Sequence, residues 1–208
     1  MHKGIFITLE GIDGIGKTTH ADLVAGFFRQ KGKGVVLTRE PGGTKIGESI
    51  RNLLLKKDDE ELCPDTELLL MFAARAQHIL EVIKPALKEN KIVICDRFID
   101  ASYAYQGGGR GIDPLRINVL ANLIAPDLTP DLTVLLDAPI EIALERAGQR
   151  DSGDRFETET SHFFQSIRDA YLKLAKSESG RISVVDASRD IDTVQNAIVK
   201  VLENKKLC

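Results

Sequence analysis

The most informative spacing of residue types lies close to the amino terminus, between positions 10 and 19. Gly11, four further residues and then Gly16-Lys17-Thr18 match the pattern of a phosphate-binding loop. In such a loop, glycines let backbone N–H groups turn toward an anion, the lysine reaches the β- and γ-phosphates, and the hydroxyl binds Mg²⁺. The sequence therefore predicts a site for a nucleoside triphosphate and Mg²⁺, with Thr18 as a metal ligand. The residues expected around the triphosphate are Gly11, Ile12, Asp13, Gly14, Ile15, Gly16, Lys17, Thr18 and Thr19.

A phosphate-binding loop needs a strand before it and a helix after it, and the sequence predicts both. Residues 4–9, Gly-Ile-Phe-Ile-Thr-Leu, are rich in β-branched and aromatic side chains, as in a buried parallel strand. After Thr18, apolar residues recur at helical spacing until Gly32. The alternative is a glycine turn that merely joins a strand to a helix, and the phosphate loop is the interpretation that this context favours.

The loop must be held by a larger fold, and the apolar runs of the chain indicate which one. Short apolar runs alternate with helical patterns, which is typical of an α/β protein with a parallel sheet covered by helices on both faces. The expected strands are Gly4 to Leu9, Val35 to Thr38, Ile92 to Cys95, Leu132 to Leu136 and Ile182 to Val185.

Two helices can be predicted in more detail. Residues 66–87 place apolar side chains on one helical face, most of which should be buried, and Pro85 should kink or shorten the end of this helix. Residues 114–124 should form another helix, because Asp113 suits its cap and Pro114 its first position. The apolar face of the first helix consists of Leu68, Leu69, Phe72, Ala76, Ile79, Leu80 and Ile83.

Composition restricts the class of protein. The chain has 208 residues, is 43% hydrophobic and carries a formal net charge of −3, which we expect of one soluble globular domain. This charge favours neither nucleic acid nor a membrane surface as a partner, and no apolar stretch approaches the ~20 residues of a membrane span.

Cys63, Cys95 and Cys208 are odd in number and lack metal-ligand spacing, which fits a cytoplasmic location. Cys95 lies in an apolar run, where it should pack as a small hydrophobe.

Two arginines follow strands of the predicted sheet. Arg39 comes after the second strand and Arg97 after the third, so both should lie with Lys17 at the carboxyl edge, where open α/β sheets bind ligands.

A GTPase switch is disfavoured because the chain lacks the guanine-reading Asn-Lys-x-Asp. A hydrolytic ATPase module would need an acidic pair at a strand end, whereas Asp96 is followed by Arg97. Converging cations instead favour a small-molecule kinase that brings two anions together.

Longer motifs make the chain similar to a known family. They include Phe-Ile-Thr-Leu-Glu-Gly-Ile-Asp-Gly-Ile-Gly-Lys-Thr-Thr from residue 6, Thr-Arg-Glu-Pro-Gly-Gly-Thr from 38, Asp-Arg-Phe from 96 and Ser-Tyr-Ala-Tyr-Gln-Gly from 102. Further motifs are Leu-Asp-Ala-Pro from 136, Ala-Leu-Glu-Arg from 143 and Arg-Asp-Ala-Tyr-Leu-Lys-Leu-Ala from 168. In this order, and from end to end, they resemble the thymidylate kinases of the bacterial kind.

The resemblance implies an activity and an architecture. The activity is transfer of the γ-phosphoryl group of ATP to dTMP, with Mg²⁺, giving dTDP and ADP on the route to dTTP and DNA. The architecture is a P-loop nucleoside monophosphate kinase fold, a five-stranded parallel sheet flanked by helices, as a single domain over residues 1–208 that forms a homodimer. The alternatives are a P-loop kinase for another nucleotide or a deoxynucleoside, and a noncatalytic or hydrolytic P-loop module.

The resemblance also implies roles at the reacting end of the acceptor. Arg39 and Arg97 would bind the dTMP phosphate, with Arg97 nearest the transferred group and acting in catalysis with Lys17. Asp13 would contact the 3′-hydroxyl and bind Mg²⁺ directly or through water, also as a catalytic residue. Tyr105 would press against the deoxyribose and disfavour a 2′-hydroxyl. The alternative for the two arginines is a structural salt bridge.

Four residues are implied at the thymine base. Phe72 would stack on the ring and Arg75 would bind its O4 edge, while Ser102 and Gln106 would complete the pocket. Phe72 also lies on the apolar helical face, so its alternative is simple core packing. Arg75 lies one turn further on the same face as Phe72, which favours the binding interpretation for both.

The segment from 148 to 157 is polar and contains glycine and arginine, which suits a lid at about residues 146–157. Some members of the family carry an arginine inside the phosphate loop, but this loop has none. The missing charge is therefore expected from Arg146, which would contact ATP, and from Arg150 and Arg155, which would act in catalysis. The alternative is that these arginines are solvated surface charges.

Overall fold

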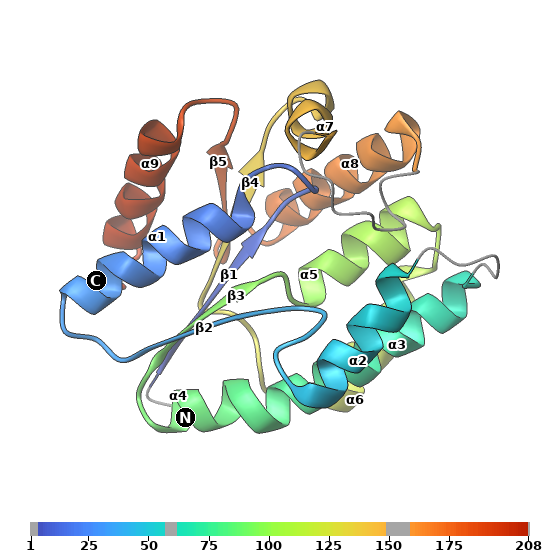
Figure 1. Cartoon of the computed structure of the whole chain (residues 1–208), viewed down its shortest axis with the longest axis horizontal. Coiled ribbons are helices and arrows are strands. Elements are labelled where there is room, and N and C mark those ends of the chain that lie inside the picture. The colour runs from blue at the N-terminus through green and yellow to red at the C-terminus, as the bar shows by residue number, and fades with distance from the viewer. Residues whose placement is uncertain (1–3, 57–61, 149–158, 208) are drawn as a thin grey trace.

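A five-stranded, fully parallel sheet forms the centre of the molecule in the computed structural model, which describes residues 4–56, 62–148 and 159–207 (Figure 1). Its strand order is β2-β3-β1-β4-β5, so the first strand lies in the middle. The strands are β1 (Ile5–Glu10), β2 (Val35–Arg39), β3 (Ile92–Asp96), β4 (Leu132–Asp137) and β5 (Ile182–Asp186). The five-stranded parallel sheet predicted from the apolar runs is confirmed.

Helices cover both faces of the sheet, with α1 and α9 on one side and α2, α3, α4 and α6 on the other (Figure 1). The α-helices are α1 (Lys17–Gln30), α2 (Lys45–Leu55), α3 (Pro64–His78), α4 (Lys84–Lys88), α5 (Ile99–Ser102), α6 (Pro114–Ile124), α7 (Ile140–Gly148), α8 (Ser161–Ser177) and α9 (Ile191–Asn204). Two π-helical segments interrupt them, η1 (Ile79–Ile83) and η2 (Tyr103–Gly109). Among these described helices, none is both long and apolar enough to cross a membrane.

Alternation along the strands explains the two covered faces. Ile7 packs in one hydrophobic cluster with Val24 and Phe28 of α1, whereas the preceding residue, Phe6, packs in another with Ile83 of η1. Successive strand residues point to opposite faces, so strands that are apolar throughout are buried on both sides.

The strands end in polar residues that lie in register at one edge. β2 and β3 each run one residue further than expected, and Arg39 pairs with Asp96 across the ladder. Asp96 also lies opposite Leu9, beside the start of the phosphate loop. This register brings residues from three strands to the same carboxyl edge.

The helix predicted over residues 66–87 is present but is not uniform. It is α-helical in α3, π-helical in η1 and α-helical again in α4, where Pro85 lies. A proline cannot donate to the carbonyl four residues earlier and its ring crowds that carbonyl, which accounts for a change of helical pitch here. The prediction of a mostly buried stripe is wrong for Leu69 and Leu80, which are 57% and 68% exposed.

The helix at 114–124 begins as predicted, with Asp113 accepting a hydrogen bond from the N–H of Leu115.

Candidate active site

The phosphate-binding loop joins β1 to α1, as predicted, and its backbone depends on glycine. Gly11, Gly14 and Gly16 all have positive φ angles, of 138°, 78° and 94°, which residues with a side chain rarely adopt. A β-carbon on Gly14 would also lie 2.0 Å from the carbonyl oxygen of Ala143, in α7. Lys17 opens α1 and its Nζ donates to the carbonyl of Ile12, 2.8 Å away. The lysine therefore lies folded over the loop that is expected to hold phosphate.

Thr18 lies beside an acidic residue that the sequence interpretation did not include in the site. Its hydroxyl donates to Oδ2 of Asp96 over 2.8 Å, at an exposed position. A hydroxyl and a carboxylate side by side are the hard oxygen ligands that Mg²⁺ prefers. The sequence held a signal for Asp96, because an acid at the end of the strand next to a phosphate loop is where P-loop enzymes place a metal ligand.

Arg97 lies at the centre of a polar cluster. Its Nη2 donates to Oδ1 of Asp13 and to the hydroxyl of Tyr105, both at 2.7 Å, and its Nη1 donates to the hydroxyl of Tyr171 at 3.2 Å. Tyr105 in turn donates to Oδ2 of Asp13 at 2.7 Å. The structure thus brings Arg97, Asp13 and Tyr105 together, and it adds Tyr171 of α8 to the cluster.

The charges of this cluster change one another's protonation. Partial desolvation would raise the pKa of Asp13, but Arg97 and Lys17 outweigh it and hold the pKa well below the usual range of an aspartate. Burial, with Arg97 adding repulsion, lowers the pKa of Lys17 to about 8. A bound phosphate would favour the charged lysine, so the loop is set to gain charge complementarity when an anion enters.

A buried glutamate, Glu10, accepts hydrogen bonds from two residues next to Arg97. Glu10, the last residue of β1, accepts from the N–H of Phe98 and from the hydroxyl of Tyr171, both at 2.7 Å. Burial raises the pKa of Glu10 to about 8, and the neighbouring Asp100 adds to this effect. Glu10 is separated from Tyr171 by 161 residues, so no local pattern could have revealed this pair.

A hollow beside the cluster contains several residues expected at the acceptor. It has an empty volume of about 560 Å³, part of it open to solvent, and Arg75, Ser102, Tyr105 and Gln106 line it. Nη1 of Arg75 donates to the hydroxyl of Ser102 at 3.0 Å. Phe72 is buried instead, with its ring centroid 4.8 Å from the Arg75 guanidinium carbon. Phe72 is therefore next to this acceptor hollow without lining it.

A second hollow lies over the phosphate loop. Gly14, Gly16, Lys17, Thr18 and Arg39 are among the residues that line it. Arg39 is half exposed and its Nη2 donates to Glu48 of α2 at 2.9 Å. Residues common to both hollows are Asp13, Glu40, Arg51 and Arg97. Arg51, in α2, was not expected at the site, because nothing in its local sequence distinguishes it from a surface arginine.

The arginines of the expected lid are only partly described. Arg146 lies in the last turn of α7, where its Nη1 donates to the carbonyl of Ala187 at 2.8 Å and its Nη2 to that of Ser188 at 3.3 Å. It thereby ties α7 to the segment after β5. Arg150 and Arg155 lie outside the described residues.

Comparisons with known proteins agree with the fold. A family model described as thymidylate kinase matches residues 9–198. A thymidylate kinase of Pseudomonas putida is 52% identical over 200 residues, covering 96% of this chain and 95% of the relative. One from Methylococcus capsulatus is 52% identical over 204 residues, covering 98% and 97%. The crystal structure of thymidylate kinase from Ehrlichia chaffeensis is 40% identical, covers 96% of this chain and 98% of its own, and superposes with a TM-score of 0.77. The resemblance and the P-loop kinase fold expected from the motifs are confirmed, and the chain belongs to the thymidylate kinase family.

Proposed function

We propose that this chain transfers the γ-phosphoryl group of ATP to dTMP, giving dTDP and ADP, in the cytoplasmic supply of dTTP for DNA synthesis. The observation that carries the proposal is the meeting of two hollows at Arg97, one over the phosphate loop and one beside Arg75. A kinase needs two adjoining sites, because the donor and acceptor phosphates must meet in line.

The residues present fit ATP and Mg²⁺. Three glycines with positive φ and a lysine at the start of α1 form the cradle that a triphosphate requires. Thr18 and Asp96 supply adjacent oxygen ligands for the metal, and Asp13 remains the proposed further ligand, directly or through water. When bound, Mg²⁺ neutralises charge on the β- and γ-phosphates. Arg146 is proposed to line the ATP site from α7.

Arg97 is the residue that we place nearest the transferred group. The second pKa of a phosphate monoester lies near ~6, so the attacking oxygen of dTMP is already anionic at neutral pH and needs no general base. The remaining difficulty is repulsion between the two polyanions. Arg97 stabilises the phosphate of dTMP where it meets the γ-phosphate, and Lys17 holds the donor oxygens. Arg39, which lines the hollow over the phosphate loop together with Arg97, binds the same dTMP phosphate.

The acceptor hollow is proposed to hold the nucleoside. Arg75 donates to O4 of thymine, while Ser102 and Gln106 line the base. Tyr105, which lines this hollow and donates its hydroxyl hydrogen to Asp13, is proposed to press against the deoxyribose and to disfavour a 2′-hydroxyl. Phe72 packs under Arg75, and we propose that it stacks on the base when the acceptor binds.

A coupled ADP-release assay tests this proposal. ATP and Mg²⁺ are supplied with dTMP, dUMP, UMP, CMP or AMP as the acceptor. We expect ADP release to depend on the acceptor and to be fastest with dTMP. Preference for another acceptor would move the chain to a different nucleotide kinase, and release of ADP without any acceptor would indicate a hydrolytic module instead.

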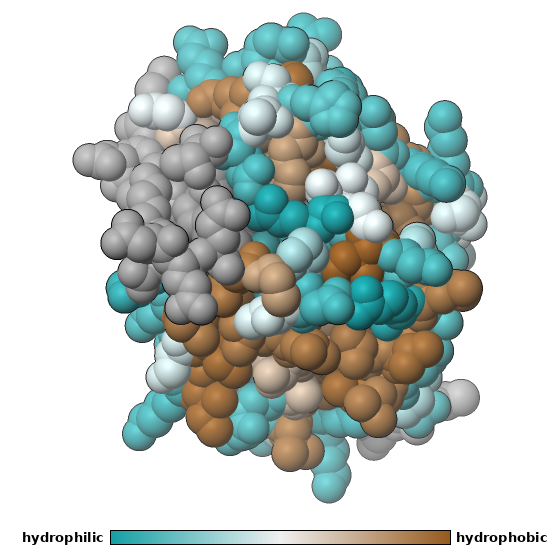
Figure 2. Space-filling model, turned by 90° about the vertical axis from the view of Figure 1, so that its right-hand side faces the viewer, coloured by the Kyte–Doolittle hydropathy of each residue, from teal (hydrophilic) through white to brown (hydrophobic). Residues whose placement is uncertain are grey.

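We further propose that the chain forms a homodimer through α6 and the neighbouring α3. Leu115, Val119 and Leu123 repeat every four residues along α6 and are 70%, 67% and 75% exposed. Leu69 of α3 is also exposed, and Figure 2 shows apolar side chains gathered over the lower part of the face that it views. An apolar stripe of this kind, on a helix whose other face is buried, suits a second copy of the same surface.

A further inference from the structure

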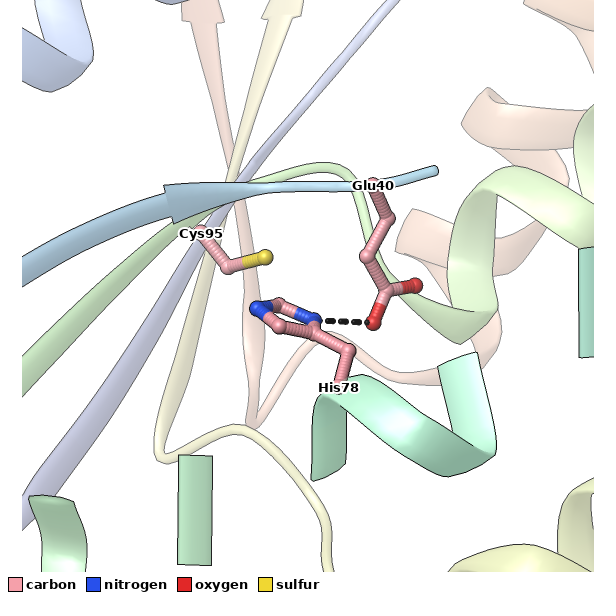
Figure 3. A group of neighbouring side chains, drawn as sticks. All are labelled: Glu40, His78 and Cys95. Carbon is pink, nitrogen blue, oxygen red and sulfur yellow. Dashed lines mark hydrogen bonds and ion pairs between the residues drawn. The ribbon is translucent and has the colours of Figure 1, made fainter. Parts of the chain in front are cut away.

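We propose that Glu40 and His78 are positioning residues that orient Arg75 for recognition of the acceptor base. The proposal rests on the role of Arg75 stated above and extends it to two residues that do not themselves bind the base. Glu40, which directly follows β2, lies in the wall of the acceptor hollow. His78 of α3 lies behind it and points at its carboxylate (Figure 3).

A continuous chain of hydrogen bonds leads to the guanidinium. Nδ1 of His78 donates to Oε1 of Glu40 at 2.9 Å, and Oε2 of Glu40 accepts from Nε of Arg75 at 2.6 Å. Nε2 of His78 lies 2.6 Å from the hydroxyl of Thr38, and the two form a hydrogen bond. The orientation of the imidazole is thus set at both nitrogens.

Three hydrogen bonds hold the guanidinium of Arg75 in one orientation. Besides Glu40, it contacts the hydroxyl of Ser102 at 3.0 Å and the carbonyl of Phe98 at 2.9 Å. A guanidinium has five N–H groups, and these contacts use three of them. Among the described residues, the other two have no hydrogen-bond partner. Because Arg75 lines the acceptor hollow, the contact to Glu40 fixes where those two N–H groups point.

Stability alone is a poor reason for this arrangement. The side chains of Glu40 and Arg75 are each 3% exposed and that of His78 is fully buried. Burying an ion pair costs desolvation that its attraction often fails to recover, so a buried pair is weak evidence for stability. The pair does provide a fixed direction for the N–H groups of Arg75 at the wall of the acceptor hollow.

A metal site is the other interpretation of the same residues. Glu40, His78 and Cys95 offer ligand atoms within 4.8 Å of one another. However, each carboxylate oxygen of Glu40 already has a donor, and the thiol of Cys95 donates to the carbonyl of Arg97 at 3.0 Å. A cation would also face the adjacent guanidinium of Arg75. The contacts therefore favour the positioning role.

The test is steady-state kinetics of Glu40→Gln with dTMP and ATP varied separately. The amide keeps the shape but removes the charge that holds Nε of Arg75, so we expect the KM for dTMP to rise about 10- to 100-fold. The KM for ATP and kcat at saturating dTMP should change by less than about threefold. Asp100→Asn is the matched control, because Asp100 is another buried carboxylate paired with an arginine, Arg181. It should lower thermal stability without a selective change in the KM for dTMP.

A second pair of variants keeps the proposal testable should Glu40→Gln fold poorly. His78→Phe removes the donor to Glu40 and should raise the KM for dTMP, whereas His78→Gln, whose amide can donate, should restore most of the affinity. Equal increases in the KM for dTMP and ATP, or a loss of thermal stability with no change in either, would overturn the positioning role. Arg75→Lys separates the two proposals: an unchanged KM for dTMP there would reject Arg75 as the base contact itself.

Discussion

Arg97 shows how one residue combines strain with function. Its φ of 71° lies in the left-handed region, which costs about 1 kcal/mol or more for a residue with a side chain. The backbone is held there because the N–H of Arg97 donates to Leu9 at 3.0 Å and the next N–H donates to Glu10. This conformation turns the guanidinium toward Asp13 and Tyr105, at the meeting point of the two hollows.

Replacing Arg97 by lysine tests the need for a planar fork. Lysine keeps the charge, but its ammonium group cannot replace the planar guanidinium that donates hydrogen bonds to Asp13, Tyr105 and Tyr171. We expect kcat/KM for dTMP to fall about 100-fold or more, with kcat most affected, in steady-state assays. The control is Arg189→Lys, because Arg189 is an exposed arginine paired with Asp186 at the same edge of the sheet. Similar losses in both variants would contradict a specific role for the Arg97 guanidinium.

Asp96 is the residue whose proposed role depends on a metal. Asp96→Asn removes the carboxylate beside Thr18, so we expect a kcat at least about tenfold lower and a half-saturating Mg²⁺ concentration shifted upward. A Mg²⁺ titration at saturating ATP and dTMP measures both. Asp186→Asn, at the end of β5, should leave the titration unchanged. If Asp96→Asn loses activity with an unaltered Mg²⁺ dependence, Asp96 acts on Thr18 and not on the metal.

At the scale of elements, the expected lid remains a prediction from sequence. The phosphate loop supplies Lys17 but no arginine, so charge on the γ-phosphate during transfer must be met from another segment. We expect Arg150→Ala to lower kcat far more than it weakens dTMP binding, measured by turnover and by equilibrium titration. Arg155→Ala should behave in the same way. Unchanged turnover in both variants would refute a catalytic lid.

The exposed stripe on α6 leads to a prediction about assembly. Val119→Glu places a charge in the middle of the stripe, where a partner copy would have to bury it at high cost. We expect the variant to elute as a monomer in size-exclusion chromatography with light scattering, while the wild type elutes as a dimer. Ile191→Glu, on the exposed part of α9, is the control and should not change the mass. A monomeric wild type would reject the proposal outright.

At the scale of the whole molecule, local patterns predicted most of the fold and part of the site. Runs of buried strand residues and the spacing of glycines are local, so the sheet and the phosphate loop could be predicted. Helical periodicity marks an apolar face but not what covers it, which is why Leu69 and Leu80 were expected inside. Contacts between distant residues, such as Glu10 with Tyr171, depend on how the elements pack and leave no signal in one sequence.

Glu10 couples the site to the stability of the whole chain. Its pKa is about 8 in the folded protein because it is buried, against an ordinary value of 4.5. Between these values the unfolded chain has released the proton while the folded chain still holds it, so unfolding releases a proton and stability falls as pH rises. Below pH ~4.5 both states are protonated, and above pH ~8 both are ionised, so the contribution is constant outside this range.

We therefore expect the free energy of unfolding of the wild type, relative to Glu10→Gln, to decrease steadily from pH 5 to pH 8. The limiting slope for one proton is about 1.4 kcal/mol per pH unit. Urea unfolding of both variants at several pH values measures the difference, and it cancels the titration of groups that the two share, Lys17 among them. A difference that stays constant across this range would mean that Glu10 is ionised in the folded protein, with Phe98 and Tyr171 compensating its burial.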